Sequence, residues 1–326
     1  MNLRLEELLK LTRVGCCSLL IVTFLVFSLQ MAKAQMADHV TCHAHHELTE
    51  KERSDLSRRF RAWRVSGRRL DTVSSEPRYV PVVFHVLSES APTLSAFNTA
   101  VAQLNDAFAN QGTFASASGI DTKIRFCLAQ TAPDGGRTSG VNHVPSAYGA
   151  HDIDLETDQV FRRTYWDTDR YLNIYLVNVI NGESAATYSG RTWWQRFGVG
   201  GYATSWGIAV TSLSPGLLAH ECGHYFGLLH TFEGLDCKND DCEVDGDMVC
   251  DTPPDRSVFE PCGDNSCLSD TLSNFSNGFF MEDTLDMSTN IMDYSPCPTD
   301  FTLGQAERMH FTLDQSYPSL ASLGAE

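Results

Sequence analysis

Three histidines and a glutamate stand within the short string HECGHYFGLLH. If this string is helical, His220 and His224 project from the same face one turn apart, with Glu221 beside them. Gly227 can adopt the left-handed conformation that ends a helix, so the chain can turn back and bring His230 to the same point. Three imidazoles that leave one coordination position open are typical of a catalytic zinc site, and we therefore expect Zn²⁺ here.

This arrangement predicts the hydrolysis of a peptide bond by activated water. Zinc at an open site lowers the pKa of its bound water from about 16 to about 7. Glu221 is adjacent to the ligands without being one, so it can act as the general base and pass the proton to a leaving amine. The alternative is an amphipathic core helix whose histidines are simply hydrogen-bonded, but the long spacing HExxHxxGxxH rarely arises by chance.

Several further segments accompany this string in order along the chain. They are PVVFHVL at 81–87, IRFCLAQ at 124–130, DRYLNIYLVNVI at 169–180, GDMVCDTPP at 246–254, NIMDYSPC at 290–297 and FTLGQAERM at 301–309. Together with HECGHYFGLLHTF they resemble the pappalysin (cytophagalysin-like) branch of the metzincin metallopeptidases. The resemblance implies a secreted zinc endopeptidase that is made as a latent precursor.

The resemblance also implies an α+β fold, the metzincin zincin fold. Its upper subdomain, expected at 78–227, has a twisted mixed five-stranded sheet, a backing helix and the active-site helix; its lower subdomain, at 228–326, is irregular and disulfide-rich. A signal peptide is expected at 1–34, because basic residues precede an uncharged run that leads to Ala-Lys-Ala. A retained signal anchor is the alternative. Residues 35–77 would form a propeptide whose end is approximate.

Carried over residue by residue, the resemblance gives the zinc ligands as His220, His224 and His230 and the general base as Glu221. It places Met292 in a turn that forms an apolar floor beneath the metal. Tyr294 could donate its hydroxyl to the oxyanion of the tetrahedral intermediate. Plain core packing is the alternative for Met292 and for Tyr294. Cys222 and the stretch 182–200 depart from the family pattern, which leaves substrate preference open.

Charge is divided unevenly along the chain. Residues 35–70 contain eight Lys or Arg against five acids, whereas residues 71–326 contain twelve against thirty-four. A basic segment before an acidic body suggests a propeptide that docks partly by electrostatics; a merely solvated helix at 47–64 is the alternative.

The acidic body would repel phosphates, so nucleic acid is not expected as a partner, whereas peptide or protein substrates are. We expect a monomer with no stable membrane association after leader cleavage.

Cys42 lies in the expected propeptide beside three histidines. Its thiolate could occupy the fourth zinc position and keep the precursor latent. An incidental Cys/His tract and a separate metal site are the alternatives.

Eight cysteines follow the propeptide, and an even number in an exported chain indicates disulfides. The family pattern implies the pairs Cys237–Cys267 and Cys262–Cys297. Cys242 with Cys250 and Cys127 with Cys222 would then be left over. Cysteine-ligated zinc is disfavoured, because paired CxxC motifs are absent.

Acidic residues are dense in the loop between Asp236 and Asp255. Carboxylates and backbone carbonyls at irregular spacing suit Ca²⁺, and the resemblance also implies calcium in this subdomain. Asp247, Asp251 and Thr252 are the candidate ligands, and a solvated acidic loop is the alternative.

Residue periodicity predicts the elements that position these groups. Strands are expected at 80–87, 123–130, 172–179, 201–205 and 207–212, and helices at 94–109, from 215 onward and at 303–315. The strand at 201–205 is expected to be the exposed edge that pairs with an extended substrate. Taken together, the sequence predicts a secreted zinc endopeptidase. The alternatives are a secreted binding or adhesion module that keeps a vestigial metal site, and a zinc hydrolase of non-peptide amides.

Overall fold

The structure, a computed structural model, describes residues 48–67, 76–87, 91–144, 150–151, 164–180, 187–189, 207–258, 261–268, 280 and 283–320. The chain divides into two units, 1–40 and 41–326, and every described residue belongs to the second. The expected signal peptide at 1–34, Cys42 and the strand expected at 201–205 therefore lie outside the described residues.

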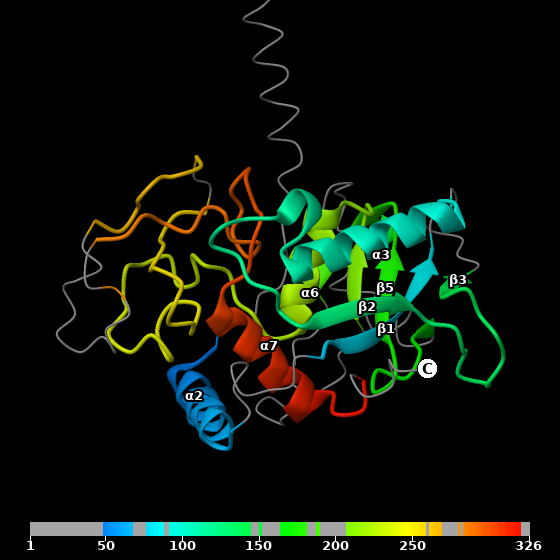
Figure 1. Cartoon of the computed structure of the whole chain (residues 1–326), viewed down its shortest axis with the longest axis horizontal. Helices are drawn as coiled ribbons and strands as arrows, with labels where there is room; N and C mark the ends of the chain where they lie inside the picture. Colours follow the sequence, from blue (N-terminus) through cyan, green and yellow to red (C-terminus); the bar gives the residue numbers. More distant parts are fainter. Residues whose placement is uncertain are drawn as a thin grey trace, which may run out of the picture. The chain divides into compact units, whose positions relative to one another are not determined.

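A twisted, mostly parallel sheet forms the framework of the second unit (Figure 1). Its strands run in the order β2 (Ile124–Leu128), β1 (Arg78–Val86), β5 (Leu172–Leu176), β8 (Ile208–Val210) and β7 (Thr187–Ser189), with only β7 antiparallel. Four of these strands, β1, β2, β5 and β8, lie where strands were predicted, whereas β7 lies at a position where none was. A sixth short strand, β3 (Val141–His143), also pairs with β1, and β4 (Ala150–His151) pairs with β6 (Val179–Ile180) in a separate ladder.

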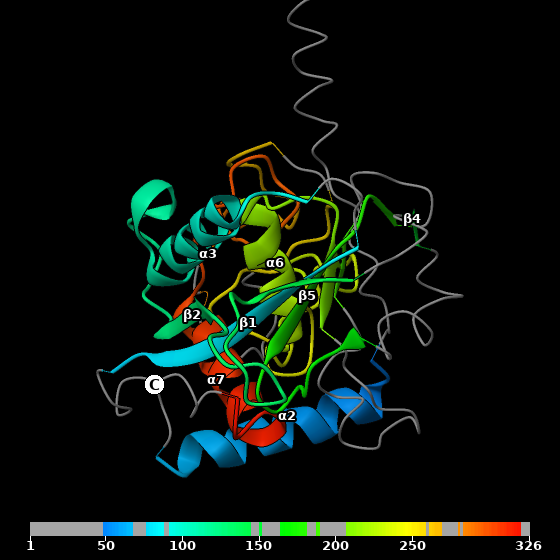
Figure 2. The same ribbon diagram turned by 90° about the vertical axis from the view of Figure 1, so that its right-hand side faces the viewer.

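Two helices cover one face of this sheet, as the two perpendicular views show (Figures 1 and 2). The backing helix α3 (Leu94–Ala109) begins at the N-cap Thr93 and ends at Asn110, which has a left-handed conformation with φ of 54°. Aromatic contacts join α3 to the sheet, with ring centroids 4.9 Å apart for Phe97 and Phe84. The second helix, α6 (Pro215–Tyr225), contacts α3 and carries the first part of the HECGHYFGLLH string.

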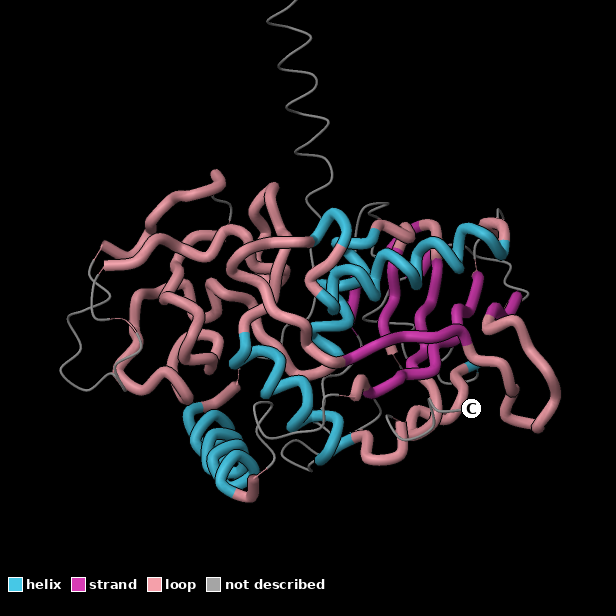
Figure 3. The backbone as a smooth tube through the Cα atoms, in the orientation of Figure 1, coloured by secondary structure: helices cyan, strands magenta, loops and turns pink. Residues whose placement is uncertain are grey.

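The chain after α6 is mostly irregular until its last helix, α7 (Leu303–Ser316) (Figure 3). Disulfides supply connections that regular structure does not: Cys237–Cys267, Cys242–Cys250 and Cys262–Cys297. The first and third are the pairs that the family pattern implies.

Among the described residues, no helix has the length and apolar character needed to cross a membrane.

The remaining pair, Cys127 with Cys222, was predicted wrongly, because both cysteines are free thiols. Phe126 packs toward the helices, with its ring 6.2 Å from that of Phe226 just after α6. Neighbouring residues on a strand point to opposite faces, so Cys127 points away from the helical layer in which Cys222 is buried.

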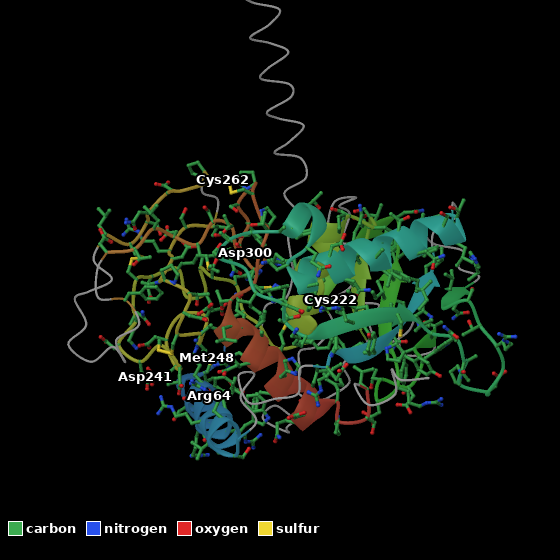
Figure 4. The ribbon with its side chains drawn as sticks, in the orientation of Figure 1. Arg64, Cys222, Asp241, Met248, Cys262 and Asp300 are labelled. Carbon is green, nitrogen blue, oxygen red and sulfur yellow. A yellow bond between two sulfur atoms is a disulfide. The ribbon has the colours of Figure 1, made fainter. Side chains whose placement is uncertain are left out.

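A basic helix, α2 (Glu50–Val65), precedes the sheet and docks on the acidic loop and on α7 (Figure 4). Arg61 contacts Asp241 and Glu243, and Arg64 bridges Glu243 and Glu307. Apolar contacts accompany the charges, since Phe60 packs edge-on against Phe311 of α7 at 5.5 Å. The helix is therefore docked rather than merely solvated, through the opposite charges that the sequence predicts.

Candidate active site

Helix α6 brings two of the predicted zinc ligands to one point and then ends where the third must approach. Pro215 occupies the first turn, where a missing N–H costs nothing. The helix ends at Tyr225, and Gly227 follows with φ of 90°, a backbone conformation that favours glycine. The N–H of Leu228 donates to the carbonyl of Gly223, so the chain turns sharply back toward the helix.

This turn brings His220, His224 and His230 together. The Nε2 atom of His224 lies 3.0 Å from Nε2 of His220 and 3.0 Å from Nε2 of His230. The three ligand atoms all lie within 4.8 Å of one another, a property of no other group of three or more His, Cys, Asp or Glu among the described residues. The three residues are 7%, 3% and 2% exposed, so their convergence is a buried feature.

The hydrogen bonds of the rings decide whether a metal fits. Nδ1 of His220 lies 2.7 Å from the carbonyl oxygen of Ile291, and Nδ1 of His224 lies 2.9 Å from that of Leu228. A carbonyl oxygen can only accept, so each Nδ1 carries the ring proton. Burial lowers the pKa of His220 to about 4, which keeps this ring neutral near pH 7 and leaves its Nε2 with an unshared lone pair.

Unprotonated nitrogens that face one another at this distance repel unless a cation lies between them. Four-coordinate zinc has Zn–N bonds of about 2.0–2.1 Å, which separate its ligand nitrogens by roughly 3.3 Å. The two 3.0 Å distances from Nε2 of His224 are close to that value, so the residues present fit zinc. The carbonyls of Ile291 and Leu228 hold the rings in the orientation that a metal ligand needs.

Two further predicted residues lie beside this cluster. Glu221 follows His220 on α6 and is fully buried. Tyr294 is half-buried, and its ring centroid lies 5.5 Å from that of His220 and 4.9 Å from that of His230. A partly accessible phenol therefore lies beside two of the three rings, and a buried glutamate directly follows the first of them in the helix.

Met292 lies directly under α6. It is fully buried, and a Cβ atom at Gly223, which precedes His224, would lie 2.4 Å from its sulfur. The turn that carries Met292 is fixed by Asn290, whose side-chain oxygen accepts from the Met292 N–H. Asn290 and Gln305 of α7 exchange two side-chain hydrogen bonds of 2.9 Å, which fasten the turn to the last helix.

The predicted calcium ligands separate into two groups. Asp247 is buried, and its carboxylate accepts from the Thr252 hydroxyl at 2.8 Å and from the Val249 N–H at 3.0 Å. Asp251 instead accepts from the Thr302 hydroxyl and the Gly304 N–H at the start of α7. The structure therefore brings Asp247 and Thr252 together and directs Asp251 to a helix N-terminus, where a carboxylate is favoured.

Sequence reasoning missed three contributors to the site. The carbonyls of Ile291 and Leu228 orient the ligand rings, but backbone groups have no signature in residue type. Phe232 stacks on His230 with ring centroids 4.7 Å apart, and its position two residues after the ligand could have drawn attention to it. Strand β7 falls inside the stretch 182–200, where no strand was expected.

Comparisons with known proteins agree with this geometry. The family model described as Pregnancy-associated plasma protein-A, of the M43 peptidases, matches residues 154–314. An extracellular metalloprotease of Neurospora crassa is 30% identical over 249 residues, which cover 71% of this chain and 73% of that protein. An extracellular metalloprotease of Sordaria macrospora is 29% identical over 255 residues, with 71% and 73% covered.

Solved structures give the same fold. A mutant of promirolysin from Tannerella forsythia superposes with a TM-score of 0.60 at 23% identity, covering 87% of this chain and 98% of that one. Mature mirolysin of the same organism, in complex with a cleaved peptide, gives 0.56 at 21% identity, covering 76% and 99%. The predicted metzincin fold class is thereby confirmed. The chain is a metalloendopeptidase of the peptidase M43 family, the pappalysin type of metzincin.

Proposed function

We propose that this protein is a secreted zinc endopeptidase that hydrolyses peptide bonds with Glu221 as the general base. The observation that carries the proposal is the convergence of three Nε2 atoms, two of them on rings whose Nδ1 protons are held by carbonyl oxygens. Zinc bound by His220, His224 and His230 would supply a Lewis acid that lowers the pKa of a water molecule and polarises the scissile carbonyl.

The protein's own groups would move the protons. The buried carboxylate of Glu221 takes one proton from the attacking water and holds it on an oxygen atom. The same carboxyl group then gives that proton to the amide nitrogen as the C–N bond breaks, so Glu221 returns to its starting state. Tyr294, next to His220 and His230, donates its hydroxyl to the carbonyl oxygen as negative charge develops there.

Peptides or proteins fit this site better than small amides do. Strand β7 pairs antiparallel with β8 and is the last strand on that side of the sheet among the described residues. An edge strand can pair with an extended peptide through main-chain hydrogen bonds, which small amides cannot exploit over several residues. An extended substrate would pair with this edge of the sheet; the strand expected at 201–205 lies outside the described residues.

Secretion and latency are part of the proposal. The relatives from Neurospora crassa and Sordaria macrospora are named extracellular metalloproteases, which supports export through a signal peptide at 1–34. Residues 35–77 would act as a propeptide, and the docking of α2 on the acidic loop supports this role. Cys42 remains the candidate for a thiolate that silences the zinc in the precursor.

Calcium would stabilise the lower part of the enzyme. Burial raises the pKa of Asp247 to about 8, although the nearby charge of Arg308 opposes this shift, and a bound cation would favour the charged carboxylate further. Asp247 and Thr252 supply the side-chain oxygens of the proposed site. Asp251 would act indirectly, because both of its oxygens accept hydrogen bonds at the start of α7.

A panel of unstructured peptides tests the endopeptidase assignment. Cleavage by the processed enzyme should stop when zinc is chelated and return when one equivalent of zinc is added back. Zinc binding without cleavage of any peptide would favour the adhesion module, and turnover of small amides alone would favour the other hydrolase. Cleavage that persists with zinc fully removed would disprove the proposal.

A further inference from the structure

Phe232 connects the third predicted zinc ligand with the predicted oxyanion donor. Its ring lies flat against that of His230, with ring centroids 4.7 Å apart and planes only 8° from parallel. The same ring meets Tyr294 in an edge-on arrangement, with centroids 5.0 Å apart and planes inclined by 61°. Offset-stacked and edge-on pairs are the arrangements that aromatic rings favour, so both contacts stabilise the placement of the three rings.

The backbone around Phe232 is held on both sides. Before it, the N–H of Thr231 donates to the carbonyl of Met292 at 3.4 Å. After it, the N–H of Glu233 donates to the carbonyl of His230 at 3.1 Å. The side chain of Phe232 is buried between its two ring neighbours, with only 5% of the residue exposed. Phe232 therefore presents a rigid aromatic surface to Tyr294.

The backbone of Tyr294 is also fixed, but its side chain lies at the margin of the site. The N–H of Asp293 donates to the carbonyl of Asn290 at 3.1 Å, and the N–H of Ser295 donates to the Asp293 carboxylate at 2.9 Å. Tyr294 itself is half-buried, so its ring borders the solvent. The turn thus fixes where the side chain begins, and the rings around it decide which rotamer the phenol adopts.

Three rings surround that of Tyr294. Their centroids lie 5.5 Å away for His220, 4.9 Å for His230 and 5.0 Å for Phe232. The two imidazoles are proposed zinc ligands, so a bound metal would set their positions. Phe232 has no metal-binding atom, and its ring can be changed without altering the ligand set.

We propose that Phe232 is a positioning residue of the peptidase, whose ring keeps the Tyr294 phenol beside the zinc ligands. This role rests on the proposed function, in which the phenol donates to the oxyanion. A donor of this kind is effective when it is already in place as charge develops, because no reorganisation is then needed. Misplacement of such a group by about 1 Å can cost about 10²-fold in rate.

A double-mutant cycle tests this role in the kinetics. Phe232→Leu removes the flat ring but keeps an apolar side chain, and it should lower kcat by about 10- to 100-fold with little change in KM. In a chain that already carries Tyr294→Phe, the same change should lower kcat by less than about twofold, because the hydroxyl that Phe232 positions is absent. A residue that only packs in the core would lower kcat by the same factor in both backgrounds.

Phe114→Leu is the matched control. Phe114 is 6% exposed, close to the value for Phe232, and lies in the short helix η1 (Gly112–Phe114) that follows α3. Both changes should lower the midpoint of urea unfolding, since each removes buried apolar volume. Only Phe232→Leu should lower kcat, which separates a loss of positioning from a general loss of stability.

The position of the Tyr294 ring is a measurement that needs neither zinc nor activity. Crystal structures are compared for the full chain carrying Glu221→Gln, with and without Phe232→Leu. The tyrosine ring should leave its place 4.9 Å from the ring of His230 and move toward the space that the smaller side chain leaves.

An unmoved Tyr294 ring in the Phe232→Leu structure would overturn the proposal, as would equal losses of kcat in the two backgrounds or in the Phe114→Leu control. If the parent shows no zinc-dependent cleavage of peptides, the proposed function fails, and the two structures alone decide whether Phe232 holds the tyrosine. Should Phe232→Leu fail to fold, Phe232→Met, with an unbranched and adaptable apolar side chain, decides by the same measurements.

Discussion

The side chain of Met292 occupies the space that a Cβ atom at Gly223 would need. That atom would lie 2.4 Å from the methionine sulfur and 3.3 Å from its terminal methyl carbon, and real Cβ contacts are essentially never that short at the sulfur. Gly223 lies between His220 and His224, two of the proposed zinc ligands on α6, so the absence of its side chain lets the methionine turn approach this helix. Gly223, which the sequence alone did not single out, therefore sets the distance between α6 and the side chain of Met292.

Gly223→Ala should therefore displace Met292 and weaken zinc binding. Overpacking of a buried site costs about 1–3 kcal/mol, which outweighs the gain of up to about 1 kcal/mol from replacing glycine with alanine in a helix. Urea unfolding and zinc content measure both effects. Gly216→Ala on the same helix is the matched control, because nothing lies within 4 Å of its added Cβ, and it should be neutral or slightly stabilising.

Truncating the methionine should relieve this clash. The double variant Gly223→Ala/Met292→Ala should be less destabilised than the sum of the two single changes, with a coupling of about 1 kcal/mol or more. Strict additivity in the unfolding free energies would mean that the alanine methyl group finds room without moving Met292.

Glu221→Gln should reduce kcat/KM by about 10²–10⁴, because general-base catalysis contributes that much and glutamine cannot take a proton. Zinc content, measured by elemental analysis, should remain one per chain, since the substitution leaves the three imidazoles unchanged. Glu233→Gln, three residues after the last ligand, is a control of the same chemistry and should retain activity. Full turnover by the Glu221 variant would assign the base to another group.

Tyr294→Phe should lower kcat by about 10²-fold with little change in KM. The phenol is proposed to donate to charge that exists only in the transition state, and loss of one such donor costs this much. Steady-state kinetics on one peptide separates the two constants. A rise in KM at unchanged kcat would instead indicate that Tyr294 only packs against substrate.

Arg64→Gln should loosen α2 from the acidic loop. Arg64 bridges Glu243 and Glu307, which are both largely buried, and its loss leaves Glu307 without this partner. The docking free energy should fall by about 1–3 kcal/mol, which hydrogen exchange of the α2 amides would report as roughly 5- to 150-fold faster opening. Arg58→Gln is the control, because its pairing with Asp55 is exposed and confined to α2. Equal exchange in both variants would exclude an electrostatic docking role.

His85 should make stability fall in mild acid. Burial lowers its pKa to about 4, and its Nδ1 already accepts a hydrogen bond from Asn142. The unfolded histidine has a pKa of about 6.5, so between pH 6.5 and 4 the unfolded state binds the proton and gains stability. About 2 kcal/mol of unfolding free energy should be lost between pH 6.5 and 5 from this group.

Urea unfolding of the wild type and His85→Phe across this range checks the sign. The variant should be less stable at pH 7, because Asn142 and Asn173 lose their shared partner, but its stability should depend less on pH. If the unfolding free energy falls equally with pH in both proteins, His85 takes up its proton in the folded state as readily as in the unfolded state.

The sequence predicts those parts of the fold whose side chains follow a clear period. The helix expected at 94–109 matches α3, and the helix expected at 303–315 matches α7 to within one residue. The strands expected at 80–87, 123–130, 172–179 and 207–212 are confirmed with shorter or shifted ends. Long apolar runs and capping residues carry enough information in sequence to define these elements.

The parts that were missed depend on groups far apart in the chain. Strands β3 and β7 have three residues each, too few to show a period, and their partners define them. The faces on which Cys127 and Cys222 lie depend on how the sheet packs against α6, which no spacing reveals.

The paired amides of Asn290 and Gln305 also bear on when the enzyme can become active. During translation the zinc-ligand residues leave the ribosome well before Gln305, so a nascent chain contains its imidazoles without the helix that fixes the methionine turn. The floor of the centre can be secured only after α7 has been made. Until then the turn that carries Met292 lacks the two side-chain hydrogen bonds that fasten it to the last helix.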